Sequence, residues 1–169
     1  MSGDLGTKAA LRHAGFRGFV RVSQLGTNGL AVVPSDEGVY AVVGDGSPPR
    51  FLDVSPAGRF KGEDPTVPTS LLRANWVDRA ELLYVGKAPR GASGRRGLAT
   101  RLAELIAFGY GRPVGHWGGR YLWQLAESGK LEVAWLATAA PAGLENEILM
   151  SFRAAHGAYP FANIAGPRG

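Results

Sequence analysis

The distribution of apolar residues along the chain predicts three short β-strands. Each segment is rich in β-branched or aromatic residues and is bounded by turn-forming residues. Because side chains alternate between the two faces of a strand, Tyr40 and Val42 are predicted to share one face of the first strand. In the second strand, Leu82, Tyr84 and Gly86 are predicted to share a face. The three segments are VYAVV at 39–43, ELLYVG at 81–86 and KLEVAWLAT at 130–138.

Helical spacing of apolar residues predicts one helix after the second strand and another after the third. The last helix is expected to begin at Pro141, which suits a first turn, and to end near His156. Weaker helical patterns cover residues 8–14 and 121–127, and residues 44–70 are rich in glycine and proline, which predicts a long loop or insertion carrying short strands. These elements describe a small mixed α/β (α+β) domain with too few strands for a doubly wound sheet. The first of the two long helices is defined by Leu98, Leu102, Leu105 and Ile106.

Composition restricts the classes of protein to which the chain can belong. It has 169 residues, about the size of one domain, and 45% of them are apolar, as in an ordinary soluble core. It contains no cysteine, which excludes disulfides, thiolate metal sites and cysteine nucleophiles. No apolar run approaches the roughly 20 residues of a membrane span, and the N-terminus lacks the apolar core of a signal peptide. We therefore expect a cytoplasmic protein with no membrane partner.

Basic residues dominate the charge and are concentrated after the second predicted strand. The chain has 19 Lys and Arg against 14 Asp and Glu, a net charge of +5. That charge favours an anionic partner, although a protein that is merely basic explains it equally well. Residues 87–103 contain five basic residues and no acid. Such a segment before a helix suits the binding of a nucleic-acid phosphate backbone at the helix N-terminus. A solvated loop is an equally good interpretation. They are Lys87, Arg90, Arg95, Arg96 and Arg101.

Known nucleotide-binding loops do not explain this basic segment. The sequence GKA at 86–88 lacks the hydroxyl residue of G-x-x-x-x-G-K-[ST], and Glu81 stands where that motif needs its first glycine. The later glycines Gly91, Gly94 and Gly97 are spaced as G-x-x-G-x-x-G rather than G-x-G-x-x-G. A nucleotide-binding fold is therefore not expected.

Two charged residues take unusual positions on the predicted helices. Arg101 lies at the edge of the apolar stripe of its helix, where it either snorkels to solvent or reaches a site at the edge of the sheet. Glu145 falls inside the apolar stripe of the last helix, whereas Glu147 falls outside it. A carboxylate on a buried face is costly unless it is paired or holds a cation. A first-turn glutamate favoured by the helix dipole is the alternative.

Taken in order, these residues resemble the motifs of the GIY-YIG nuclease superfamily, which includes homing endonucleases, certain restriction enzymes and the excision-repair nuclease subunit. The resemblance covers about residues 36–166 and extends to uncharacterised bacterial members. It implies a three-stranded, mainly antiparallel sheet flanked by helices. Residues 1–35 would be an N-terminal extension packed on a domain of residues 36–169, and residues 44–80 an insertion between the first two strands. The matching elements are GVY at 38–40, YVG at 84–86, Arg101, Glu145 in E-x-x-I-L, and Asn163.

The resemblance implies a metal-dependent endonuclease that hydrolyses phosphodiester bonds in DNA. Tyr40 would act as general base or orient the attacking water, and Tyr84 would assist at the phosphate. Arg101 would stabilise charge on the phosphoryl oxygens. Glu145 would be the sole protein ligand of a Mg²⁺ or Mn²⁺ ion, while Asn163 would fasten the site architecture. Such a site is physically sensible, because phosphoryl transfer needs positioning and charge neutralisation, and hard cations prefer oxygen ligands.

The sequence departs from the family pattern at positions that bear on the chemistry. Because a tyrosine with an unperturbed pKa near 10 is a poor base at neutral pH, we expect Lys87, Arg101 or a metal-bound water to favour its phenolate or share its proton, and we assign this role to Lys87. The position one turn after the helix arginine, often His or Tyr in the family, is Leu105. His116 is a candidate proton relay in its place, and a surface or capping histidine is an equally good interpretation.

Arginines outside the motif set are assigned to substrate binding, and several aromatic residues stand beside one of them. Trp117 and Tyr121, next to Arg120, either stack on bases or belong to the core, whereas Trp123 is assigned to the core. A nucleic-acid-binding module without turnover is the alternative function, and a structural or protein-binding domain is a third. The sequence leaves open the strandedness of the DNA, the choice between DNA and RNA, and the oligomeric state. The substrate-binding arginines are Arg90, Arg95, Arg96 and Arg120.

Overall fold

The protein has an α+β fold built on a four-stranded antiparallel sheet, seen here in a computed structural model that describes residues 3–27 and 29–164. The strand order is β1-β4-β2-β3, so β2 and β4 are central and β1 and β3 form the two edges. No helix within the described residues is long and apolar enough to cross a membrane. The strands are β1 (Arg17–Arg21), β2 (Gly38–Val43), β3 (Leu82–Ala88) and β4 (Glu132–Ala137).

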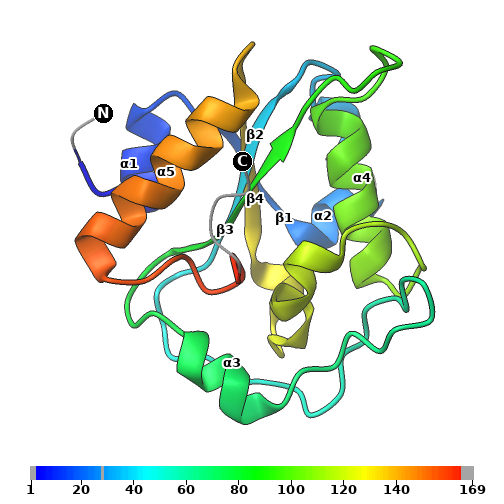
Figure 1. Ribbon diagram of the computed structural model, residues 1–169, viewed down its shortest axis with the longest axis vertical. Coiled ribbons are helices and arrows are strands. Elements are labelled where there is room, and N and C mark those ends of the chain that lie inside the picture. The colour runs from blue at the N-terminus through cyan, green and yellow to red at the C-terminus, as the bar shows by residue number, and fades with distance from the viewer. Residues whose placement is uncertain (1–2, 28, 165–169) are drawn as a thin grey trace.

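Helices cover both faces of this sheet. Figure 1 shows α1 and α5 on one face and α2 and α4 on the other, with α3 at the lower edge of the molecule. Two apolar cores result: one lies under α1 and α5, and the larger one lies under α2, α4 and the segment after α4. The α-helices are α1 (Lys8–His13), α2 (Val22–Thr27), α3 (Thr69–Asn75), α4 (Leu98–Gly109) and α5 (Pro141–His156), and the 3₁₀ helices are η1 (Gly29–Val32), η2 (Trp117–Gln124) and η3 (Ser128–Lys130).

The sheet has a fourth strand that the hydrophobic pattern did not predict. Strand β1 comes from the N-terminal segment and pairs with β4, so the expected three-stranded sheet was wrong. The pairing is irregular between Gly18 and Val20, and both Gly18 and Phe19 have positive φ angles, of 92° and 57°. Such an irregularity breaks the strict alternation by which a strand is recognised in a sequence.

The side chains of β2 alternate between the two cores as predicted. The alternation along β3 is interrupted by an irregularity. Tyr40 and Val42 face the larger core. The pairing of β2 with β3 shifts between Val42 and Val43, which places Leu82 in the other core and on the opposite side from Tyr84. The expectation that Leu82 shares a face with Tyr84 was therefore wrong, because a bulge reverses the side-chain alternation locally.

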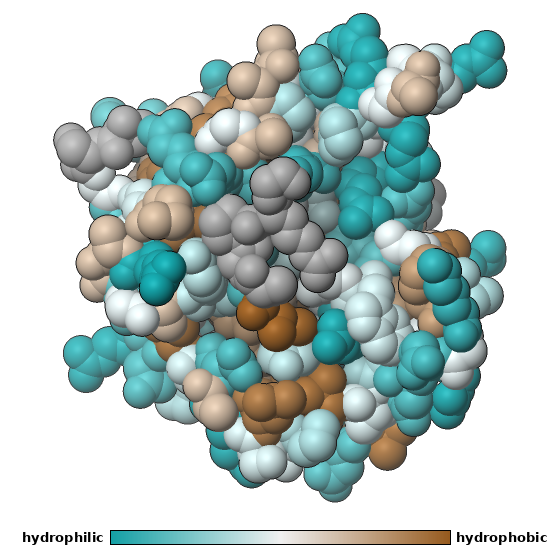
Figure 2. Space-filling model, viewed as in Figure 1, coloured by the Kyte–Doolittle hydropathy of each residue, from teal (hydrophilic) through white to brown (hydrophobic). Residues whose placement is uncertain are grey.

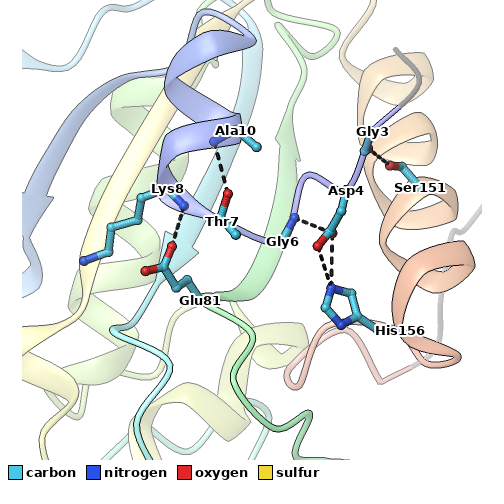
Figure 3. Close-up of polar contacts among 9 residues, drawn as sticks. All are labelled: Gly3, Asp4, Gly6, Thr7, Lys8, Ala10, Glu81, Ser151 and His156. Atoms are coloured by element: carbon cyan, nitrogen blue, oxygen red, sulfur yellow. Dashed lines mark hydrogen bonds and ion pairs between the residues drawn. The ribbon is translucent and has the colours of Figure 1, made fainter.

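The N-terminal segment is attached to the rest of the fold by polar contacts (Figure 3). Thr7 caps α1 by accepting a hydrogen bond from a backbone N–H in its first turn. The backbone N–H of Lys8 donates to the Glu81 carboxylate at 2.7 Å, just before β3. Farther toward the N-terminus, the Asp4 carboxylate lies 3.1 Å from Nε2 of His156 at the end of α5. These contacts tie α1 to both the sheet and α5.

Residues 44–80 form the long connection between β2 and β3, and a single buried glutamine fastens it to η2. Of the expected short strands, the described residues show only isolated bridges, together with the helix α3. The Gln124 side chain is fully buried, and its Oε1 accepts from the Val67 N–H at 2.7 Å. Its Nε2 donates to the backbone oxygens of Leu52 and Val67, at 2.9 and 2.8 Å. The glutamine therefore joins two points of the connection to the chain that follows α4.

Replacing Gln124 by leucine is expected to lower the free energy of unfolding by about 3 kcal/mol or more. Three backbone groups would lose their partners, and each buried polar group left unpaired costs roughly 1–3 kcal/mol. Urea unfolding followed by circular dichroism measures the change, with Gln24→Leu as the matched control because Gln24 is exposed on α2. A loss below about 1 kcal/mol would show that water replaces the glutamine in this role.

Candidate functional site

Most of the residues selected from the sequence lie around one pocket, at the end of the sheet where β2 begins and β3 ends. The pocket has a volume of about 470 Å³. Its walls come from β2, β3, α4, η2, α5 and the segment after α5, which are far apart along the chain. It is lined by Tyr40, Tyr84, Gly86, Lys87, Arg101, Trp117, Gly118, Arg120, Glu145, Ala162, Asn163 and Ile164.

A tyrosine and a histidine form a buried pair at the inner end of the pocket. The Tyr40 hydroxyl lies 2.7 Å from Nε2 of His116, and both residues are 0% exposed. Burial raises the pKa of Tyr40 well above its usual value, and neighbouring Tyr84 adds to the rise while Arg101 opposes it. Burial and the Arg101 charge lower the pKa of His116 to about 3. At neutral pH the pair therefore consists of a neutral phenol and a neutral imidazole.

This pair bears on two expectations from the sequence. His116 is a buried residue in contact with Tyr40 rather than a surface histidine. Cations were expected to favour the Tyr40 phenolate, yet burial prevails over Arg101 and the phenol keeps its proton. Nδ1 of His116 is buried and has no hydrogen-bond partner among the described residues. When the phenol donates to Nε2, the neutral imidazole carries its own proton on Nδ1, and Nε2 is the proton acceptor beside the phenol.

Tyr84 completes a cluster of three rings around this end of the pocket. Its ring centroid lies 6.0 Å from those of both Tyr40 and His116. Gly86, two residues further along β3, pairs with Tyr40 across the sheet. A Cβ atom at residue 86 would overlap the end of the Tyr40 ring, because the ring lies directly over this glycine. The glycine of YVG is thus a packing requirement for the position of Tyr40.

Arg101 projects from α4 toward the pocket and is held by two acceptors. Its Nη1 donates to the Glu104 carboxylate and to the backbone oxygen of Gly115, both at 2.8 Å. Burial lowers the pKa of Arg101, but Tyr40, Glu104 and Tyr84 outweigh this effect and the net shift is upward. Glu104 also accepts from Arg96 at 2.6 Å. Sequence reasoning missed Glu104, although its i+3 spacing from Arg101 on one helix was a usable signal.

Glu145 and Lys87 face each other across the opposite wall of the pocket. The Lys87 ammonium nitrogen lies 3.7 Å from a Glu145 carboxylate oxygen, and the carboxylate side chain is 16% exposed. Burial raises the pKa of Glu145, and Lys87 only partly offsets this rise. The expected placement of Glu145 on the inner side of α5 is thus confirmed, as is the outward position of Glu147.

Among the described residues that line the pocket, Glu145 is the one carboxylate that could hold a hard divalent cation. A carboxylate in a partly desolvated pocket gains from a cation beside it, and oxygen is the ligand atom that Mg²⁺ and Mn²⁺ prefer. Among the described residues there is no group of three or more His, Cys, Asp or Glu that could hold a metal. One carboxylate leaves the remaining coordination positions to water and to phosphate oxygens, which is how Mg²⁺ is commonly bound.

Asn163 holds the last described segment of the chain against β3. Its side-chain oxygen accepts from the Val85 N–H at 2.9 Å, and its side-chain nitrogen donates to the Val85 oxygen at 2.8 Å. The adjacent Ala162 N–H donates to the Leu83 oxygen at 2.8 Å. Asn163 therefore fixes the strand that carries both Tyr84 and Gly86.

The substrate-binding arginines selected from the sequence separate into two groups. Arg120 lines the pocket. Arg90, Arg95 and Arg96 are exposed on the loop between β3 and α4, which projects from the top of the molecule in Figure 1. Figure 2 shows mainly hydrophilic residues over this loop and the surface beside it. The loop is therefore a basic surface adjoining the pocket wall formed by α4.

Comparison with protein-family models, with curated proteins and with solved structures found no match to this chain. The function is therefore inferred from the geometry of the pocket.

Proposed function

We propose that the protein is a metal-dependent endonuclease that hydrolyses phosphodiester bonds in DNA, with a GIY-YIG-like site. The observation that carries the proposal is the pocket itself. The Tyr40 phenol, the Arg101 guanidinium and the partly buried Glu145 carboxylate line it from β2, α4 and α5. The His116 imidazole, in the segment before η2, is in hydrogen-bond contact with the phenol. Phosphodiester hydrolysis needs these groups: a proton acceptor for the attacking water, cations for the phosphoryl oxygens and a ligand for a metal.

The Tyr40–His116 pair accounts for proton removal at neutral pH. A water that attacks phosphorus passes a proton to the Tyr40 oxygen as the phenol releases its own proton to Nε2 of His116. The phenol thus never has to exist as a free phenolate, which its raised pKa disfavours. The negative charge of a bound phosphate stabilises the imidazolium and offsets the burial that lowers its pKa. His116 is accordingly the residue that holds the proton, and Tyr40 is the residue that accepts a proton from the water.

Other residues of the pocket position and neutralise the phosphate. Glu104 and Gly115 accept from one nitrogen of the Arg101 guanidinium, which has five N–H groups in all. Arg101 stabilises the charge that develops on the phosphoryl oxygens. Tyr84 orients the phosphate from the adjacent strand, and Asn163 keeps that strand in place. A Mg²⁺ or Mn²⁺ ion held by Glu145 would supply charge neutralisation at the phosphate and at the leaving oxygen.

A nucleic-acid-binding module without turnover is the second candidate, and the basic loop favours it. Arg90 and Arg95 are exposed outside the pocket, where they suit backbone contacts that need no catalysis. A binding module, however, has no use for a buried Tyr40–His116 pair at the bottom of a recess. The endonuclease is therefore the better supported function.

The proposal is tested with labelled single-stranded, duplex and branched DNAs incubated with Mn²⁺, Mg²⁺ or EDTA. We expect cleavage that requires the divalent ion, and Glu145→Gln should raise the Mn²⁺ concentration for half-maximal cleavage about tenfold or more. Glu147→Gln is the matched control, because Glu147 lies on the outer side of the same helix. Binding of DNA without cleavage under every condition would leave only the binding module. Undiminished cleavage by Glu145→Gln would overturn the metal assignment.

A further inference from the structure

We infer that the pocket takes a DNA strand with an unpaired nucleotide at the cut, and that the base of this nucleotide stacks on a platform formed by Trp117 and Arg120. This inference rests on the proposed nuclease function and specifies its substrate class.

The depth of the reacting group disfavours a continuous duplex. Tyr40 is 0% exposed and Tyr84 is 8% exposed, although both line the pocket. A phosphate that rests on the molecular surface therefore does not touch the Tyr40 hydroxyl. Duplex DNA keeps its phosphates on a stiff helix, and enzymes that need a recessed nucleotide either use single strands or extrude the nucleotide at the cost of unpairing it. An unpaired strand enters without that cost.

The platform lies on η2, in the lining of the same pocket. Trp117 is half-buried, its ring meets Phe108 edge to face with centroids 6.4 Å apart, and Gly118 beside it is exposed. The Arg120 guanidinium stands 4.8 Å from the centre of the Trp117 ring and 5.5 Å from that of Tyr121. Tyr121 itself is buried in the core. Trp117 and Arg120 are thus held by packing and remain accessible from the pocket, and both ring and guanidinium planes stack on unpaired bases.

The charge of Arg120 is uncompensated within the described structure. None of the ion pairs among the described residues includes Arg120, and its hydrogen bond in that part of the chain is to the Trp117 backbone oxygen at 3.3 Å. Arg101, by contrast, is paired with Glu104. Burial lowers the pKa of Arg120, which is the direction expected for a desolvated cation without a counterion. A base stacked on this guanidinium gains a cation–π contribution from the charge.

The volume of the pocket agrees with a ligand of this size. About 470 Å³ falls within the roughly 300–1,000 Å³ of pockets that enclose small organic ligands. The cations Arg101 and Lys87 lie on other walls than the platform, on α4 and β3. A nucleotide can therefore place its phosphate at Arg101 and its base at Trp117.

Cleavage of one sequence presented as a single strand, a duplex and a duplex with a single-stranded flap tests the substrate class. We expect the single strand and the flap to be cut at least tenfold faster than the duplex. Trp117→Leu should abolish this preference, and Trp117→Phe, which keeps a ring, should retain most of it. Equal or faster cutting of the duplex by the wild type would overturn the inference and leave the proposed nuclease intact.

A binding experiment decides the inference even if the protein cuts nothing. The Tyr40→Phe protein in EDTA is titrated with oligothymidine strands that carry the fluorescent base 2-aminopurine at each position in turn, since its fluorescence falls on stacking. We expect one or two positions to be quenched, with binding weakened about tenfold by Trp117→Leu and by Arg120→Gln. Arg73→Gln removes the same charge from exposed α3 and should bind normally. Absence of quenching at every position, or quenching unchanged in Trp117→Leu, would overturn the platform.

Discussion

Replacing Tyr40 by phenylalanine is expected to slow DNA cleavage by about 10²–10⁴-fold while the protein remains folded, because the change removes the group that receives a proton from the attacking water. The ring that packs over Gly86 is kept, so the strand geometry is retained. The buried Nε2 of His116 loses its partner, which lowers the free energy of unfolding by roughly 1–3 kcal/mol. Single-turnover rates in saturating Mn²⁺, together with a thermal melt, measure both effects.

The matched control for this substitution is Tyr159→Phe. Tyr159 lies outside the pocket, where its hydroxyl contacts Arg153 at 3.0 Å. Removing that hydroxyl should leave the cleavage rate within about twofold of the wild type, in line with the small effects of surface changes. If Tyr40→Phe retains more than about a tenth of the wild-type rate, Tyr40 is not the proton acceptor, and the role of the Tyr40–His116 pair is structural.

The second large effect concerns stability in acid, and it arises from His116. In the folded protein burial and Arg101 lower the pKa of His116 to about 3, whereas an unfolded histidine has a pKa near 6.5. Between these values the unfolded chain binds a proton that the folded protein does not, so the free energy of unfolding falls as the pH is lowered. The loss begins near pH 6.5, amounts to about 1.4 kcal/mol per pH unit and is complete near pH 3.

Urea unfolding at intervals from pH 7 to pH 4 measures this dependence. His116→Gln should show a shallower decline than the wild type by about 1.4 kcal/mol per pH unit, since glutamine does not titrate. His13→Asn serves as the control for the loss of a histidine, because His13 is exposed at the end of α1. If the free energy of unfolding fell with pH equally in the wild type and in His116→Gln, His116 would be protonated in the folded state. It could then not be the neutral proton acceptor that we propose.

The elements predicted correctly from the sequence are those whose apolar residues follow a regular helical or strand period. Strands β2 and β4 and helices α4 and α5 appear near their expected positions, because their apolar residues recur at the period of the element. Strand β1 was missed because its bulge and positive φ angles disrupt the alternation. Helix α3 has only seven residues and follows the glycine- and proline-rich residues 44–70, and so short a helix gives little periodicity to recognise.

Local sequence also placed part of the site but not the contacts between distant segments. The faces of β2 and α5 could be read from periodicity, which put Tyr40 and Glu145 on inner surfaces. The position of His116 depends on how the segment after α4 packs, and Gln124 fixes that segment through backbone groups of residues 44–80. No period or spacing encodes such a contact. The neutral state of the Tyr40–His116 pair follows from burial, which only the folded chain defines.

The contact between Asn163 and Val85 also bears on how copies of this protein behave at high concentration. β3 is an edge of the sheet, and an edge strand with free N–H and C=O groups invites pairing with a strand of another molecule. The Asn163 amide takes up both backbone groups of Val85, and the Ala162 N–H takes up the Leu83 oxygen. A side chain here substitutes for a neighbouring strand. The segment that borders the pocket thereby also protects the molecule from aggregation through its β3 edge.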